Sequence, residues 1–525
     1  MSAIFAATAG ATDYTGPLSV SLGGQTMPSG ETTVSMTENE DGTCNLVLKN
    51  FSFMGMPVGN IKLESAKENK YSLVSTFQAS QEITIEDGED ASQQWMGKDL
   101  GTLPVYAKGT VQNGKMNAVI LIDMSNSDFG VIKVLFGDDA ENLGQIANSG
   151  MENFHQEKFL TNKGQEPNAW HSFLCCDGDL KAFASTAHTE EATDVRPGTA
   201  GTKSVKIFST GVFGKSANGT ITTGRITAGK TDPADTGNHA SADVTNTNKD
   251  ANGDPFYAAL IGMPDSIEVW MKYLPKDEST TASLSAVVTD GTYYQDPEDR
   301  EYTNVVAKAS NASIAKNDGE WQLVKVPFDT SYAEKNFGSQ TEGEAQADMP
   351  AKNILVTMST CSVPGGGSTD SKNPDVLYVD DVRLTYGCTP SAITYKGETL
   401  DGFDPETTEY AIGGKGSASE ISLSDFDDET DALDYEVSIT KNVSDDEKST
   451  TVYYTLISGD YQNTKTYVIT YTQEEEPSGI DNAKAATLGN ANAIYDLSGR
   501  RVKFNGQHGV YIVRTAEGKT VKMSK

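Results

Sequence analysis

The chain has 525 residues, a formal net charge of −33 at pH 7 and a hydrophobic content of 37%. A chain this long exceeds one hydrophobic core, so we expect about three or four domains. Its negative charge excludes nucleic acid as a partner because it repels phosphate backbones. No run of about 18 apolar residues occurs, which excludes a transmembrane helix. The 49 glycines and frequent polar turn residues, without sustained helical periodicity, predict an all-β protein.

The N-terminal residues 1–11 contain a short apolar stretch, IFAATA at 4–9, with small residues that suit a cleavage site. The basic segment that normally precedes such a stretch is missing. The stretch is therefore either the remnant of a signal peptide or an ordinary chain terminus. We interpret residues 1–11 as a signal-peptide remnant, which predicts export.

Residues 12–137 alternate between apolar runs and glycine-containing turns, and Asn113-Gly114 between two such runs is a strong hairpin signal. About eight consecutive strands with short connections favour an up-and-down barrel. The sequences YTG at 14–16, DGT at 41–43 and LVLKNF at 46–51 resemble the calycin-like, lipocalin-related domain of Bacteroidetes proteins. Such a barrel either holds one small ligand or is filled by its own side chains, and the sequence leaves both readings open.

Residues 153–386 form the largest predicted unit, with alternating strands around Trp170, Trp270 and Trp321. These three tryptophans are expected to be buried. The unit closes with VLYVDDVRLTY at 376–386, an apolar strand interrupted by two adjacent acids. The strand order and this closing run resemble the carbohydrate metabolism domain of Bacteroidetes surface proteins and jelly-roll carbohydrate-binding modules. The resemblance implies a jelly-roll β-sandwich and a carbohydrate ligand.

The remaining C-terminal part divides into a module, a linker and a small β domain. Residues 387–473 contain GFDPETTEY at 402–410 and resemble cadherin-like or immunoglobulin-like β-sandwich modules in sequence and length. Residues 474–492 begin EEEPSG, which is typical of a linker. Residues 493–525 contain IYDLSGRRV at 494–502 and resemble the C-terminal sorting domain of the Bacteroidetes type IX secretion system.

The sequence contains no recognisable catalytic motif. Its five histidines and five cysteines match no zinc or redox spacing, and neither a Gly-x-Ser-x-Gly elbow nor a phosphate-binding Gly-Lys-Ser/Thr loop occurs. With 74 acidic residues, carboxylate pairs arise by chance, so their number does not identify a glycosidase. We therefore predict that the protein is not an enzyme, with a polysaccharide-processing enzyme as an alternative, and we assign no disulfide.

The prediction of a metal site rests on the two adjacent acids of the closing strand. Related jelly-roll modules use an aspartate of this strand for structural Ca²⁺ together with an early acid, and oxygen ligands suit this ion. The resemblance therefore implies three ligands: Asp381, Asp380 and Glu152. Glu157 is the alternative early partner. Strand alternation places Asp381 on the same face as Val379, so Asp381 is preferred. The other reading is that both acids bind backbone amides and water.

A sugar site requires a flat aromatic face and a few hydrogen-bonding groups. The loop DGTYYQDP at 290–297 supplies both, and its Gly and Pro indicate an exposed turn. We predict Tyr293, Tyr294 and Asp296 as ligand-binding residues; the alternative is a tyrosine that seals the sheet edge. Asp296 and the following acids disfavour anionic polysaccharides by repulsion, which favours a neutral glycan.

Together these features predict a secreted or outer-membrane-surface protein that binds a glycan or polysaccharide without catalysis at the bacterial cell surface. This function is implied by the resemblances, since a fold alone does not determine function. The competing class is a structural adhesin or stalk with a protein partner. A concave surface with exposed aromatic rings on residues 153–386 favours the glycan, whereas a flat polar surface favours the adhesin.

Overall fold

The computed structural model describes residues 10–338, 350–474, 491–503, 508, 510–515 and 520–524. Most of the expected signal-peptide remnant and of the expected linker lies outside the described residues. Strands predominate in the described part, where the α-helices are α1 (Lys181–Ala184) and α2 (Ser331–Phe337). The predicted all-β class is confirmed. None of the described helices has the length and apolarity needed to cross a membrane.

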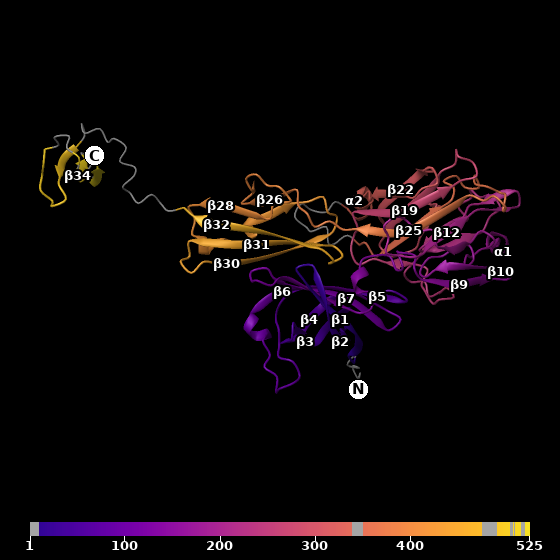
Figure 1. Cartoon of the computed structure of the whole chain (residues 1–525), viewed down its shortest axis with the longest axis horizontal. Helices are drawn as coiled ribbons and strands as arrows, with labels where there is room; N and C mark the ends of the chain where they lie inside the picture. Colours follow the sequence, from indigo (N-terminus) through magenta and orange to yellow (C-terminus); the bar gives the residue numbers. More distant parts are fainter. Residues whose placement is uncertain are drawn as a thin grey trace, which may run out of the picture. The chain divides into compact units, whose positions relative to one another are not determined.

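The first eight strands close into an antiparallel up-and-down barrel, as predicted (Figure 1). They are β1 (Thr12–Leu22), β2 (Gln25–Glu38), β3 (Thr43–Phe53), β4 (Met56–Lys70), β5 (Val74–Thr84), β6 (Thr102–Gln112), β7 (Lys115–Met124) and β8 (Gly130–Phe136). Leu18 of β1 pairs with Phe136 of β8, which closes the barrel. The predicted Asn113-Gly114 turn joins β6 to β7 with positive φ at both residues, 52° and 74°. Short 3₁₀ turns, η1 (Gly97–Leu100) and η2 (Ala140–Asn142), precede β6 and follow β8.

Two five-stranded antiparallel sheets form the main body of the second region, as a sandwich requires. One has the order β11-β12-β25-β19-β23, and the other has β15-β24-β20-β22 with β18 also paired to β24. The strands of the first sheet are β11 (Thr189–Ala192), β12 (Ser204–Phe208), β25 (Val376–Thr385), β19 (Ser266–Leu274) and β23 (Gln322–Pro327). Those of the second are β15 (Thr220–Thr222), β24 (Asn353–Ser359), β20 (Ala282–Thr289), β22 (Val305–Ile314) and β18 (Ala258–Ala259).

Three smaller sheets accompany these two. They are the pair β9 (Phe154–Phe159) and β10 (Asn162–Pro167), the pair β13 (Thr210–Val212) and β14 (Lys215–Ala217), and the trio β16 (Arg225–Ala228), β17 (Asn238–Ala242) and β21 (Tyr294–Asp296). The last two sheets contribute residues to the pocket of the candidate site.

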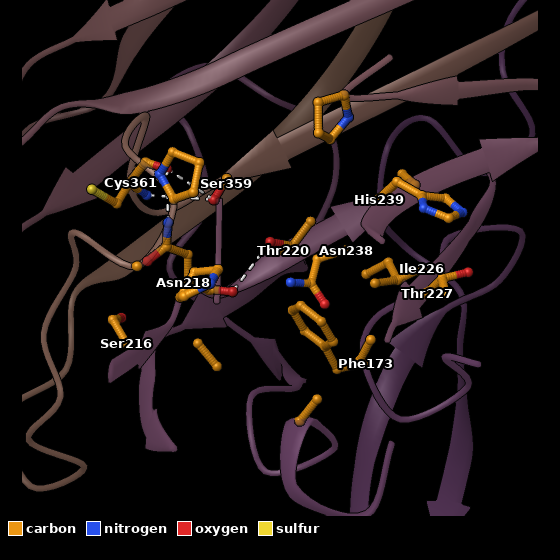
Figure 2. A pocket seen from close by; sticks show the side chains of 18 of the residues that line it. Phe173, Ser216, Asn218, Thr220, Ile226, Thr227, Asn238, His239, Ser359 and Cys361 are labelled. Atoms are coloured by element: carbon orange, nitrogen blue, oxygen red, sulfur yellow. Dashed lines mark hydrogen bonds between the residues drawn. The ribbon is translucent and has the colours of Figure 1, made fainter. Parts of the chain in front are cut away.

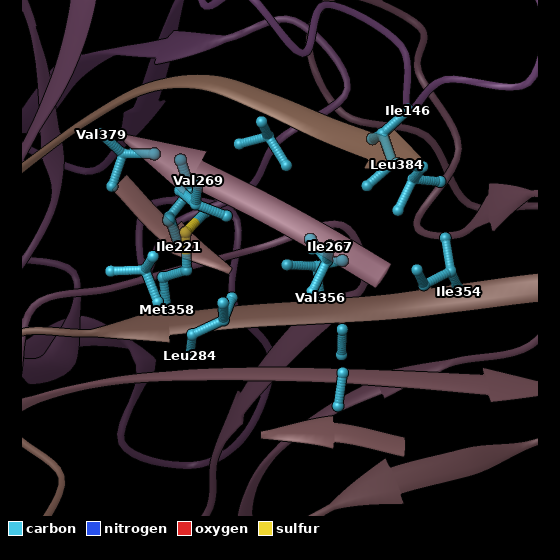
Figure 3. Close-up of a cluster of buried hydrophobic side chains, with 14 of the residues drawn as sticks. Ile146, Ile221, Ile267, Val269, Leu284, Ile354, Val356, Met358, Val379 and Leu384 are labelled. Atoms are coloured by element: carbon cyan, nitrogen blue, oxygen red, sulfur yellow. The ribbon is translucent and has the colours of Figure 1, made fainter. Parts of the chain in front are cut away.

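One apolar core joins the two large sheets (Figure 3). Ile267 and Val269 of β19 are fully buried with Leu284 of β20 and Val356 of β24. The burial of Ile267 and Val269 follows the period-two alternation of a β-strand, since Glu268 between them is only half-buried. Trp170 is also in this core, as expected, and its indole nitrogen donates to the carbonyl of Ala147 at 3.1 Å.

Strand β25 carries a bulge at its acidic pair. Its register with β19 shifts between Glu268, which pairs with Arg383, and Trp270, which pairs with Asp380. Asp381 has φ +41° at this point. An inserted residue reverses the alternation that follows it, so Asp380 is buried and Asp381 is only half-buried. The expectation that Asp381 shares the buried face of Val379 is therefore wrong.

The chain divides into two compact units, residues 1–393, 428–439 and 454–466 in one and 394–427, 440–453 and 467–525 in the other. The later strands are β26 (Ala392–Tyr395), β27 (Glu398–Thr399), β28 (Glu409–Gly414), β29 (Phe426–Glu429), β30 (Tyr435–Val443), β31 (Ser449–Ser458) and β32 (Thr464–Gln473), with 3₁₀ turns η4 (Ala418–Glu420) and η5 (Leu423–Asp425). They form sheets of order β27-β26-β29 and β28-β32-β31-β30. A last sheet has the order β33 (Ala491–Tyr495), β34 (Val510–Thr515) and β35 (Thr520–Ser524).

Candidate functional site

A pocket of about 340 Å³ opens in the region of residues 173–365. It lies among helix α1, the hairpin β13–β14, the small sheet β16-β17-β21 and strands β20 and β24 of the second large sheet. Figure 2 shows Phe173 and Asn238 near its centre, with Asn218 and His239 on opposite sides. The volume falls in the range of small-molecule sites, roughly 300–1,000 Å³.

Two exposed aromatic rings mark the apolar part of this site. Phe213, a lining residue, is 62% exposed, and its ring centroid lies 4.6 Å from that of Phe183, which is 48% exposed. Phe183 belongs to helix α1, and its neighbours Leu180 and Ala184 also line the pocket. The two rings are tilted by 54° to each other and together form an exposed apolar surface beside the pocket.

Phe213 stands in an unfavourable backbone position. It has φ +51° and Gly214 has φ +76°, so the two residues form the two-residue turn between β13 and β14. Asn-Gly is the usual pair in this turn, because both central residues adopt positive φ. A bulky residue there costs roughly 1–2 kcal/mol. Backbone strain clusters at functional sites, but it also occurs at other exposed turns of this chain, such as Met54, so the pocket beside Phe213 is what makes this position a candidate.

Hydrogen-bonding groups line the opposite part of the pocket. Asp296 accepts a hydrogen bond from the Ser285 hydroxyl at 2.6 Å, and His239 donates from Nδ1 to the Thr236 carbonyl at 2.9 Å. His239 Nε2 lies 3.4 Å from the hydroxyl of Tyr293, which places this tyrosine beside the pocket. Of the predicted residues, Asp296 therefore lines the pocket, whereas Tyr293 lies at its edge and contacts the lining residue His239.

Two lining asparagines instead support the loops. The Asn218 amide donates to the carbonyls of Cys361 and Val363, at 3.1 and 2.9 Å. The Asn238 side-chain oxygen accepts from the amides of Gly229 and Lys230, both at 3.0 Å. Both side chains are held by the chain itself, so they shape the pocket walls.

Tyr294 differs from its expected position. It is only 1% exposed, its hydroxyl donates to Glu298 at 3.1 Å, and its ring packs at 5.0 Å from that of Tyr302. Successive side chains in an extended chain point to opposite sides, so Tyr293 faces out where Tyr294 faces in. The expectation that both rings are exposed is wrong for Tyr294, which matches the alternative reading of a tyrosine that seals the sheet.

Arg196 contacts both acids of the pair on β25. Its guanidinium contacts Asp381 Oδ2 through Nε at 2.6 Å and Nη2 at 2.5 Å, and its backbone amide donates to Asp380 Oδ2 at 3.0 Å. Burial raises the pKa of Asp380 to about 6. The same guanidinium lies 5.4 Å from the ring of Trp270, which is half-buried rather than buried as expected. Trp321, by contrast, is buried.

Glu152, the expected early metal ligand, also has internal partners. Its Oε1 accepts from the backbone amides of Thr202 and Lys203, at 2.9 and 3.0 Å, and its Oε2 accepts from the Thr202 hydroxyl at 3.1 Å. The reading in which the acidic pair binds backbone amides fits Asp380, which accepts from the Arg196 amide, whereas Asp381 contacts a guanidinium. Occupancy by Ca²⁺ stays a prediction.

A cavity of about 60 Å³ in the barrel is lined by apolar side chains, among them Phe51, Ile85 and Ile132. This volume is several times smaller than a small-molecule site. Of the two readings left open by the sequence, the geometry favours the packed core.

The aromatic pair Phe183 and Phe213 was missed from the sequence. A signal was present, because VFGK at residues 212–215 places a Phe-Gly pair between two short β-like runs, where a turn requires positive φ. The partner Phe183 lies 30 residues away in the sequence, and nothing local indicates that the two rings meet.

Residues 11–139 match the family model of the calycin-like beta-barrel domain. This match confirms the resemblance inferred for residues 12–137 and defines the N-terminal barrel as calycin-like. No curated protein matches the chain significantly.

Two solved structures are similar to the chain at low identity. A "putative outer membrane protein" of Bacteroides fragilis NCTC 9343 is 11% identical, with a TM-score of 0.18, over 66% of this chain and 96% of that one. The K1 cleaved adhesin domain of Lys-gingipain from Porphyromonas gingivalis W83 is 10% identical, with a TM-score of 0.20, over 44% of this chain and 96% of that domain. Likenesses this distant identify no ligand, so the function is inferred from the pocket itself.

Proposed function

We propose that the protein binds a neutral glycan, without catalysis, in the pocket beside Phe213. The observation that carries this proposal is the exposed, strained Phe213 paired with Phe183 at a 340 Å³ pocket that also contains Asp296 and His239. An apolar ring face with a few hydrogen-bonding groups is the combination that sugars require. A concave site with exposed rings is also the feature expected to distinguish glycan binding from an adhesin role.

The composition of the pocket favours binding over hydrolysis. Glycoside hydrolysis generally uses two carboxyl groups on opposite sides of the scissile bond. Among the described residues that line the pocket, Asp296 is the single carboxylate. The polysaccharide-processing alternative therefore has no second acid at this site.

The charge at the pocket is more balanced than the sequence indicated. Lys215 and Lys230 line it together with Asp296. Glu298, one of the acids expected to repel anionic sugars, is paired with Lys308 at 2.6 Å. Repulsion of acidic sugars is therefore weaker than expected, and a test must include uronic and sulfated glycans beside neutral ones.

The proposed location is the bacterial cell surface or the extracellular space. It rests on the sorting-type resemblance of residues 493–525 and on the signal-like stretch at the N-terminus, whose residues 1–9 lie outside the described part. Protease accessibility on intact cells tests it, since a protein inside the cell stays uncut.

A glycan array with the full chain tests the binding proposal, and the variant Phe213→Asn assigns it to the pocket. Asn suits positive φ, so this variant should keep or gain stability, by up to about 1 kcal/mol, while glycan binding falls at least about tenfold. A matched control is Met54→Asn. Met54-Gly55 forms the same kind of turn between β3 and β4, with φ values of 51° and 78°, and Met54 is 66% exposed.

The Met54 variant should gain similar stability and bind glycan normally. Equal binding by both variants and the wild type would remove the pocket from the proposal. No signal on the array from the wild type would reject glycan binding and favour the adhesin alternative. A preference for uronic or sulfated glycans at low salt would reject the neutral ligand.

A further inference from the structure

A second polar cluster lies inside the region of residues 155–250, apart from the pocket and from the Asp380–Asp381 pair. We name it the His–carboxylate cluster; its members are His155, Glu157, Glu166, His171 and Asp250. The side chains of His171 and Asp250 are 0% exposed, and Glu166 is equally buried. Burying so many ionisable groups is unfavourable unless they are paired or hold a cation.

The ligand atoms of this cluster converge at short range. Asp250 Oδ2 lies 3.5 Å from His155 Nε2 and 3.6 Å from His171 Nδ1. Ring or carboxylate atoms of His155, Glu157 and Glu166 lie within 4.8 Å of one another. The same holds for Glu166, His171 and Cys175, so Glu166 adjoins both histidines.

The outer nitrogen of each histidine is fixed by a hydrogen-bond acceptor. His171 Nε2 lies 3.1 Å from the Pro255 carbonyl, which can only accept, so Nε2 carries the hydrogen and neutral Nδ1 has a lone pair. His155 Nδ1 lies 3.1 Å from the side-chain oxygen of Asn168, which leaves a lone pair on Nε2 of the neutral ring. Metal-binding histidines are held in this way by an acceptor on their second nitrogen.

Lone pairs of the neutral rings therefore face the carboxylates across the centre of the cluster. Four of its buried atoms have no hydrogen-bond partner among the described residues: His155 Nε2, Glu166 Oε2, His171 Nδ1 and Asp250 Oδ2. A cation held among these atoms would supply the partner that they lack.

Two of the separations in the cluster are close to those around a small ion. Ligand atoms of a tetrahedral ion at about 2.0–2.1 Å lie about 3.3–3.4 Å apart, and the two histidine–Asp250 separations are 3.5 and 3.6 Å. Imidazole ligands suit transition metals, whereas Ca²⁺ prefers six or more oxygen ligands. Glu157 Oε2 accepts from the Ala251 amide at 3.1 Å and lies beside His155, and the Cys175 thiol donates to the Ser172 carbonyl.

We propose that the His–carboxylate cluster binds one divalent transition-metal ion, with Zn²⁺ as the expected occupant. The ion has a structural role, because its site is buried inside the protein. It joins three segments that lie far apart in the sequence: β9–β10, the stretch at His171 and the loop at Asp250. His171 is two residues before Phe173, so the ion also anchors one wall of the glycan pocket.

The test uses the full chain stripped of metal with a chelator and reloaded with Co²⁺ as a spectroscopic probe. We expect one Co²⁺ per chain, with the visible absorption of a tetrahedral site, and displacement of that absorption by one equivalent of Zn²⁺. The variant Asp250→Asn should weaken Zn²⁺ binding at least about 100-fold. Zn²⁺ should raise the Tm of the wild type, and Ca²⁺ at the same concentration should not.

The control is His188→Gln, since His188 is half-buried and outside the cluster. It should bind Co²⁺ with the wild-type spectrum and stoichiometry. The Tm of stripped Asp250→Asn, compared with that of the stripped wild type, separates metal loss from a folding defect. The proposal is overturned if the stripped wild type takes up less than about 0.2 Co²⁺ per chain. It is equally overturned if Asp250→Asn binds as tightly as the wild type, or if Ca²⁺ and Zn²⁺ raise the Tm equally.

Discussion

Lys108 of the barrel strand β6 donates a hydrogen bond at 2.6 Å to the backbone carbonyl of Gly459, which follows β31. The lysine is 1% exposed, its ammonium lies 3.7 Å from an Asp434 carboxylate oxygen, and it stands 4.6 Å above the ring of Tyr461. The buried ammonium of Lys108 therefore contacts residues that lie about 350 positions away in the sequence but belong to the same compact unit. The lysine and Asp434 depend on each other, because either charge alone would be buried without a counterion.

The variant Lys108→Met should therefore destabilise the protein by about 2–4 kcal/mol, since it leaves Asp434 without its counterion. Denaturant unfolding measures the change. The control is Lys115→Met on β7, whose partner Asp138 lies 2.9 Å away but whose side chain is 74% exposed. Exposed pairs contribute at most about 1 kcal/mol, and a similar loss in both variants would contradict the role given to Lys108.

Calcium binding at the β25 acids is tested by calorimetry on the full chain. If Ca²⁺ uses Asp381, it must displace the Arg196 guanidinium from Oδ2. Binding should then be lost in Asp381→Ala and strengthened in Arg196→Ala, which removes the competing cation. Absence of heat with the wild type, or unchanged affinity in Asp381→Ala, would assign these acids to the ion pair alone.

The buried carboxyl group of Asp380 should make the stability of the protein depend on pH when a chelator keeps metal ions away. Its pKa in the folded protein is raised to about 6 by burial, above the ordinary 3.8, so the folded state binds this proton more tightly than the unfolded state. The contribution of Asp380 to stability is therefore full below about pH 4 and lost as pH rises through 6. The wild type, measured relative to Asp380→Asn, should gain about 1 kcal/mol between pH 7 and pH 5. A difference that does not vary with pH would refute the raised pKa.

The sequence predicted those features that repeat along the chain. Eight alternating runs with glycine turns specify the barrel because each strand pairs with its neighbour in sequence. Alternation on Ile267 and Val269 likewise identifies the buried face of β19. The prediction from strand alternation was wrong at Asp381, because a β-bulge inserts a single residue and leaves no strong local signal in the sequence.

The candidate sites depend on contacts between distant residues. Phe183 and Phe213, or His155, His171 and Asp250, meet only after the loops between them have folded. Their spacing follows no helix or strand period. The sequence therefore proposed Tyr293 and Asp296, which share one local turn, and missed the rings and imidazoles supplied by separate segments.

The adjacent residues Tyr293 and Tyr294 provide the last test, because one is beside the pocket and the other is in a core. Tyr294→Ala should destabilise the protein by about 3 kcal/mol, since it removes a ring that is 1% exposed and packed on Tyr302. Tyr294→Phe should lose about 1 kcal/mol with the hydrogen bond to Glu298. Tyr293→Ala should change stability by less than about 1 kcal/mol, because its side chain is exposed, and weaken glycan binding several-fold because its hydroxyl faces His239. Thermal unfolding and binding by the full chain measure both effects. If Tyr293→Ala leaves glycan affinity unchanged, Tyr293 is not part of the binding site.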